Sequence, residues 1–178
     1  MPAEAAQDLD FRPVSTDDLS MLADWLERPH WREWWGTPET ELGYIRDMIE
    51  GRDDTRPFII LQRGQPIGYI QVWRIASNRV EPWLTEAPWL AWLADHTVGV
   101  DLSLAEASTL SQGIGSAALR LFVARLRTEG ETDIIIDPDP ANLRAVRAYE
   151  KAGFRVIEDL KDRTGDSLLM RHVPEEHA

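Results

Sequence analysis

The chain has 178 residues, 43% of them hydrophobic, which is typical of one globular domain with a sizeable core. Its 31 acidic and 19 basic residues give a net charge of −12, which argues against nucleic acid or an anionic membrane as a partner. That charge favours either a cationic ligand or simply good solubility, and the lack of cysteine excludes disulfides, thiolate metal sites and cysteine nucleophiles.

Hydrophobic periodicity and turn residues predict elements in the order β-α-α-β-β-β-α-β-α-β-β. Ser15 and Asp18 have the spacing of a capping box at the first helix start. Pro29 is expected to end that helix, and Pro38 to occupy the first position of the next. The expected segments are strand 11–14, helices 15–28 and 38–50, strands 57–62, 67–75 and 97–104, helix 113–128, strand 132–136, helix 142–152 and strands 155–160 and 167–172.

This order predicts an α/β (α+β) fold, with a mixed central sheet of about six to seven strands and helices on both faces. One domain is expected over residues 10–173, with flexible tails at 1–9 and 174–178. Gly153 suits the left-handed position after the last helix. Residues 77–96 show no clean period and are expected to form a long loop with at most a short helix, which in a compact domain is more often functional than idle.

A glycine-containing loop, Gln112-Gly113-Ile114-Gly115-Ser116, opens the amphipathic helix at 113–128. A helix start has unpaired amides and a partial positive charge, and glycines let a ligand approach the backbone closely. This pattern predicts an anion site that could hold a pyrophosphate without a lysine. The alternative is a pair of packing or capping glycines.

A second motif follows the strand at 132–136: Asn142, and then Tyr149-Glu150-Lys151-Ala152-Gly153-Phe154. With the glycine loop, it makes the chain resemble the GCN5-related N-acetyltransferase (GNAT) superfamily over roughly residues 10–173. The resemblance implies a GNAT fold and acetyl-CoA as the acyl donor. The chain departs from the family's loop motif at the first position of that motif, which is Leu110 here. Gln112, directly before Gly113, could supply the missing polarity.

The resemblance also implies roles for single residues. Val100 and Leu102 on the 97–104 strand, the 112–116 loop and Asn142 would contact coenzyme A. Tyr149 would protonate the leaving thiolate as the general acid. The alternative for Tyr149 is a helix tyrosine half buried against the sheet.

Five segments, at residues 25–28, 33–36, 65–69, 99–101 and 137–144, make the chain similar, within this superfamily, to the aminoglycoside 6′-N-acetyltransferases. The resemblance implies Asp101 as the proposed general base and Asp137 as a ligand for the amines of the drug. In the 77–96 loop, Glu81, Glu86 and Asp95 would add acidic substrate contacts. Either aspartate could instead be a strand-end or turn residue.

Acetyl transfer requires a neutral amine, a polarised thioester carbonyl and a proton source for the thiolate. Strands that splay apart would expose a backbone N–H to polarise the carbonyl. A carboxylate with a pKa near 4 is a poorly matched base for an ammonium, so Asp101 could orient the amine instead of extracting its proton.

Eight tryptophans are many for this length. Trp25 and Trp73 are expected in the core, whereas Trp34, Trp35 and the tryptophans of the 83–92 loop could wall a sugar-binding cleft. The histidines share no metal-ligand spacing, and no metal site is expected.

The leading hypothesis is acetylation of a cationic small-molecule amine by a cytoplasmic monomer or homodimer. Two alternatives stay open: a siderophore-type hydroxylysine or small-amine N-acyltransferase of the same fold, and a non-catalytic CoA-binding module. The N-terminus lacks the pattern of a signal peptide, and no apolar run is long enough for a membrane span.

Overall fold

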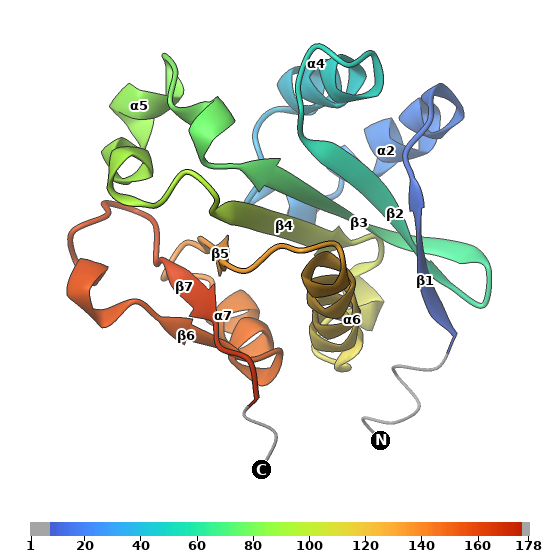
Figure 1. Cartoon of the computed structure of the whole chain (residues 1–178). Coiled ribbons are helices and arrows are strands. Elements are labelled where there is room, and N and C mark those ends of the chain that lie inside the picture. Colours follow the sequence, from blue (N-terminus) through green and yellow to red (C-terminus); the bar gives the residue numbers. More distant parts are fainter. Residues whose placement is uncertain (1–7, 176–178) are drawn as a thin grey trace.

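Residues 8–175, which the computed structural model describes, form a seven-stranded mixed sheet with helices on both faces (Figure 1). The spatial order is β1-β2-β3-β4-β5-β7-β6, and β4–β5 is the parallel pair of this sheet. This is the architecture that the sequence predicts. The strands are β1 (Leu9–Pro13), β2 (Arg56–Gln62), β3 (Gln65–Arg74), β4 (Val98–Leu104), β5 (Ile134–Ile136), β6 (Phe154–Val156) and β7 (Met170–His172).

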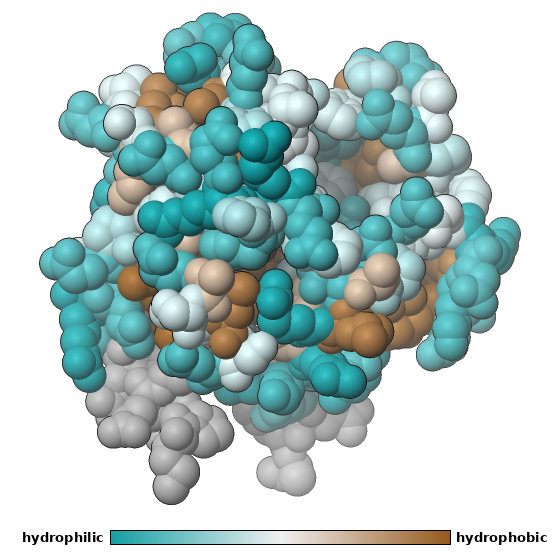
Figure 2. Space-filling view, turned by 180° about the vertical axis from the view of Figure 1, so that it is seen from behind, coloured by the Kyte–Doolittle hydropathy of each residue, from teal (hydrophilic) through white to brown (hydrophobic). Residues whose placement is uncertain are grey.

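The helices are α2 (Leu19–Leu26), α3 (Pro29–Arg32), α4 (Pro38–Ile49), α5 (Trp83–Glu86), α6 (Ile114–Thr128) and α7 (Leu143–Lys151). The expected tails lie largely outside the described residues, although Leu9 already begins β1. Every helix in the described part is too short or too polar to cross a bilayer. From behind, the surface is mainly hydrophilic with smaller apolar areas (Figure 2).

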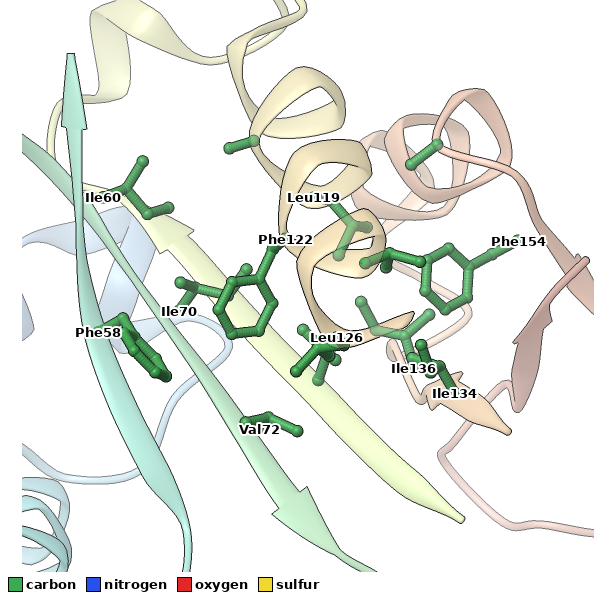
Figure 3. Packing of buried hydrophobic residues seen from close by; sticks show 14 of the residues in the cluster. Phe58, Ile60, Ile70, Val72, Leu119, Phe122, Leu126, Ile134, Ile136 and Phe154 are labelled. Atoms are coloured by element: carbon green, nitrogen blue, oxygen red, sulfur yellow. The ribbon is translucent and has the colours of Figure 1, made fainter. Parts of the chain in front are cut away.

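The central strands send alternate side chains into two cores, as the pleat of a strand requires. Ile60 and Ile70 pack with Phe122 of α6 on one face (Figure 3). Ile59 and Tyr69, one residue earlier on each strand, pack on the other face among residues of α2 and α4. Their near-complete burial fixes the register of the sheet, because a slip by one residue would exchange the two faces.

The predicted helix signals are confirmed with one change. The capping box of Ser15 and Asp18 is formed, and Gly153 has the expected left-handed backbone, with φ of 98°. Pro29 does not simply end a helix. It lies at the first position of α3, where its missing N–H leaves no intrahelical bond unmade.

The predicted final hairpin is shorter than expected. Its strands pair only from Phe154↔His172 to Val156↔Met170, and residues 158–160 form a 3-10 turn. The Leu168 N–H donates to the carbonyl of Pro138, at 2.8 Å, and so draws that segment away from β6. Residues 77–96 hold α5 and 3-10 turns, and Trp89, Leu90 and Leu93 form a third apolar cluster there.

Strands β4 and β5 diverge in the middle of the sheet. Their parallel register covers Val98↔Ile134 and Gly99↔Ile135, whereas β4 continues to Leu104. Asp101 lies on β4 just past the last pair, and Asp137 directly follows β5. The divergence therefore opens the sheet beside both carboxylates.

Candidate active site

A cavity of about 740 Å³ lies at the opening between β4 and β5. Its walls come from α4, α5, β4, the segment after β5, the N-terminus of α6 and one side of α7. The predicted site residues that line it are Trp34, Trp35, Glu86, Asp101, Leu102, Gly113, Gly115, Ser116, Asp137, Asn142 and Tyr149.

At the α6 N-terminus the backbone forms a cradle. Gly113 is the N-cap residue with φ of 84°, and Ser111 before it is also left-handed, with φ of 64°. The first intrahelical bond runs from Ala117 N to Gly113 O, so the amides of residues 114–116 have no partner within the helix. A Cβ added at Gly113 would meet nothing within 4 Å, and one at Gly115 would meet only Leu104 Cδ1 at 4.0 Å. This open space fits a phosphate group on free amides.

Three basic side chains of α7 line the same cavity, and the sequence reasoning missed their role. Arg144, Arg147 and Lys151 are spaced i, i+3 and i+7, which places them on one side of the helix. That spacing was the available signal. These side chains and the α6 N-terminus are called the basic end of the cavity, and every lysine or arginine that lines it among the described residues lies on α7.

Asn142 and Gln112, both predicted to contact the cofactor, form hydrogen bonds within the protein. Asn142 caps α7, since its Oδ1 accepts the N–H of Ala145 at 3.2 Å, while its side chain still lines the cavity. Gln112 does not line the cavity, because its Nε2 donates to the Ser108 carbonyl at 2.7 Å. Val100 and Ile114 point into the core and do not contribute to the cavity wall either.

Asp101, Asp137 and Tyr149 meet where the strands diverge. Burial raises the pKa of Asp101, and burial together with the charge of Asp101 raises the pKa of Asp137 well above its ordinary range. Burial and the two carboxylates also raise the pKa of Tyr149. Tyr149 is therefore protonated at neutral pH, and the paired carboxylates destabilise each other unless a cation lies between them.

A hydrogen-bonded chain holds Asp101. The buried Tyr69 hydroxyl donates to Gln71 Oε1 at 2.7 Å, and Gln71 Nε2 donates to Asp101 Oδ2 at 2.9 Å. Bonds from Gln71 and Trp73 lower the pKa of Asp101 and partly oppose the effect of burial. Tyr69 thereby fixes which end of the Gln71 amide faces the carboxylate.

Acids from separate segments form the acidic end of the cavity: Glu41, Asp53, Glu86, Asp101 and Asp137. Sequence reasoning missed Glu41 and Asp53. For Glu41 the available signal was its position four residues before the buried Ile45, which puts it on the inward side of α4. The remaining acid of the wall, Asp139, accepts the Ala141 N–H at 2.8 Å in the turn before α7.

Two acids predicted for substrate binding lie away from the cavity. Glu81 accepts the hydroxyl of Thr85 at 2.7 Å, and Asp95 pairs with Arg79 while its side chain stays 84% exposed. Local partners therefore hold both side chains outside the wall, and of the three loop acids Glu86 lines it.

The tryptophans are divided between the core and the cavity wall in a different way from the prediction. Trp25 is buried in the core as expected, but Trp73 is only partly buried and lines the cavity. Its indole lies over Gly99, where a Cβ would collide with the ring. Trp83 and Trp89 join Trp34 and Trp35 in the wall.

Comparisons with known proteins agree on one family. The model of the acetyltransferase (GNAT) domain matches residues 15–161. Aminoglycoside N(6′)-acetyltransferase type 1 of Klebsiella pneumoniae is 38% identical over 151 residues, covering 80% of this chain and 72% of that protein. The lysine N-acyltransferase MbtK of Mycobacterium sp. is 27% identical over 157 residues, 83% of this chain and 60% of that protein. The structure of AAC(6′)-Ib in complex with paromomycin and acetyl-CoA superimposes with a TM-score of 0.77, at 32% identity and 94% coverage of both chains.

Proposed function

The chain belongs to the GNAT family of acetyltransferases, and from this premise we propose that it transfers acetyl from acetyl-CoA to a primary amine of an aminoglycoside, at the 6′ position, by direct attack in a ternary complex.

The observation that carries this proposal is the separation of charge within one cavity. The basic end, with free α6 amides and the α7 side chains, suits the phosphates of coenzyme A. The acidic end suits a polycation such as an aminoglycoside, which the overall charge of −12 would also attract. Asp101 belongs to the acidic end and Tyr149 of α7 lies beside it, so acetyl donor and amine acceptor would meet there.

The site also offers the groups that the reaction needs. The amine nitrogen attacks the thioester carbon, a C–N bond forms, and the C–S bond breaks. Past Gly99, β4 has no β5 partner, so its backbone N–H groups on that side are available to the carbonyl oxygen. Asp101, with its raised pKa, is better matched to an amine proton than an ordinary carboxylate, and the protonated Tyr149 can donate to the departing sulfur.

In this proposal Asp101 and Tyr149 are the catalytic residues. Asp137 and Glu86 bind amines of the acceptor, with Trp34 and Trp35 against its sugar rings. Gly113, Gly115 and Ser116 hold the pyrophosphate, and Leu102 and Asn142 line the cofactor arm. Their shared cavity supports these roles.

The test is release of free CoA from acetyl-CoA in the presence of kanamycin or tobramycin, with mass spectrometry and NMR to locate the new amide. An aminoglycoside with a hydroxyl in place of the 6′-amine is the matched control, and it should not be acetylated. Turnover only with lysine or hydroxylysine would contradict the aminoglycoside proposal and favour a small-amine acyltransferase. Kanamycin binding without turnover would favour a binding module.

The proposal includes a cytoplasmic site of action, where acetyl-CoA is available. It also includes a monomer or a homodimer as the active form. Light scattering at several protein concentrations would distinguish monomer from dimer.

A further inference from the structure

Glu41 is the acid that helix α4 contributes to the cavity, and the backbone holds its carboxylate in place. Its Oε1 accepts the Gly36 N–H at 3.1 Å. A Cβ at Gly36 would collide with Oε1, so the glycine lets the turn after Trp35 close onto the carboxylate. Because Trp34 and Trp35 line the same cavity, this bond ties the aromatic wall to α4.

The other oxygen of Glu41, Oε2, is not occupied by a hydrogen bond from the described residues. Among residues 8–175, no donor lies within hydrogen-bond distance of Oε2, and no lysine, arginine or histidine forms an ion pair with Glu41. Burial and the charge of Asp101 raise the pKa of Glu41, while the Gly36 bond lowers it. Two neighbouring carboxylates repel each other, and a cationic ligand close to both would offset that repulsion.

We infer that Glu41 binds a second ammonium group of the acceptor while Asp101 and Asp137 hold the amine that reacts. Three separate elements, α4, β4 and the segment after β5, bring these carboxylates to one cavity, so an acceptor with two or more amines satisfies more of them than a monoamine. Glu41 is thus a specificity-determining residue that selects polyamines. This inference rests on the proposed function and adds the number of amines to its substrate class.

The Glu41→Gln variant tests the role of the negative charge and can keep the hydrogen bond from the Gly36 N–H. The glutamine side-chain oxygen can still accept the Gly36 N–H, so the turn keeps its bond while the negative charge is lost. We expect KM for kanamycin to rise about tenfold with kcat little changed, as for loss of one hydrogen bond to a charged group. KM for methyl 6-amino-6-deoxyglucoside, an acceptor with one amine, should change less than about twofold.

The matched control is Glu39→Gln on the same helix. Glu39 is exposed and does not line the cavity, so this variant makes the same change in net charge and should leave both KM values unchanged. Equal effects of Glu41→Gln on the two acceptors, or no effect on either, would overturn the inference.

A binding measurement separates this inference from the proposed function. If no acceptor is acetylated, the proposed function fails, yet titration of kanamycin into the CoA-bound protein still tests Glu41. About tenfold weaker kanamycin binding by Glu41→Gln, with the one-amine sugar unaffected, would support the role of Glu41 in that case. Unchanged kanamycin affinity would overturn it whether or not turnover occurs.

Discussion

The basic and acidic ends of the cavity are assembled in different ways. The basic end comes from one stretch of chain, the start of α6 and the side of α7, within residues 113–151. The acidic end draws Glu41, Asp53, Glu86, Asp101 and Asp137 from separate segments. The i, i+3 and i+7 spacing of the basic residues is a signal within one short stretch, whereas Glu41 and Asp53 join the acidic end only through the fold.

The largest expected effect on activity comes from a variant that changes the acidic end and leaves the basic end intact. Asp101→Asn should lower kcat/KM for kanamycin by about 10²- to 10³-fold, because the amine loses both its charge partner and its proton acceptor. The affinity for CoA, measured by titration calorimetry, should stay within about twofold. A variant that keeps its full rate would remove Asp101 from the mechanism.

The converse variant disables the basic end. Gly115→Leu should weaken CoA binding by about 10- to 100-fold, because its side chain would fill the open space over the α6 amides. Kanamycin binding to the CoA-free protein should not change. Gly43→Ala is the control, since it also fills open space at a helical glycine but lies outside the cavity wall. Unaltered CoA affinity in Gly115→Leu would mean that the pyrophosphate lies elsewhere.

Tyr149 lies between the two ends, so its loss should affect neither binding step. Tyr149→Phe should lower kcat by about 10- to 50-fold while KM for both substrates stays nearly constant, because only protonation of the thiolate is lost. Steady-state kinetics with both substrates varied would show this split. A raised KM for CoA with an unchanged kcat would instead make Tyr149 a packing residue.

The hydrogen-bonded chain at the acidic end should shift a pH profile. Gln71→Leu removes a donor that stabilises ionised Asp101, so the acidic limb of kcat/KM should move to higher pH by about one unit. Tyr69→Phe should shift it less, because Gln71 keeps its bond. Glu41, Asp137 and Tyr149 also face this carboxylate and are intact in both variants.

An acidic limb that stays in place in Gln71→Leu would contradict a positioning role. Far-UV circular dichroism is needed as a control, since Gln71→Leu leaves the buried Tyr69 hydroxyl without its acceptor.

Sequence patterns could predict the strand and helix order and the glycine loop at the start of α6, because each depends on local periodicity or a short motif, whereas Asp101 and Tyr149 are singled out by the family resemblance. They could not predict Glu41, whose position depends on how α4 packs over the sheet. They also could not predict that Glu86 lines the cavity while Glu81 and Asp95 do not. The side chains of Glu81 and Asp95 are held outside the wall by their local partners Thr85 and Arg79. Trp73 is expected in the core, yet Gly99 opposite it on β4 has no Cβ to exclude the indole ring, and Trp73 lines the cavity.

The smallest expected effect is on stability, and it arises at the acidic end. The pKa of Asp137 is raised in the folded protein, so the folded state holds that proton more tightly than the unfolded chain. The free energy of unfolding should therefore fall as the pH rises above the ordinary carboxyl pKa of about 4. Asp137→Asn removes this penalty and should stabilise the ligand-free protein by about 1–2 kcal/mol at pH 8, with little difference near pH 4. Urea unfolding at the two pH values would measure it, with the exposed Asp166→Asn as the control. A destabilised variant at pH 8 would show that Asp137 contributes to the fold, and that the acidic end is not held under electrostatic strain for a cationic acceptor.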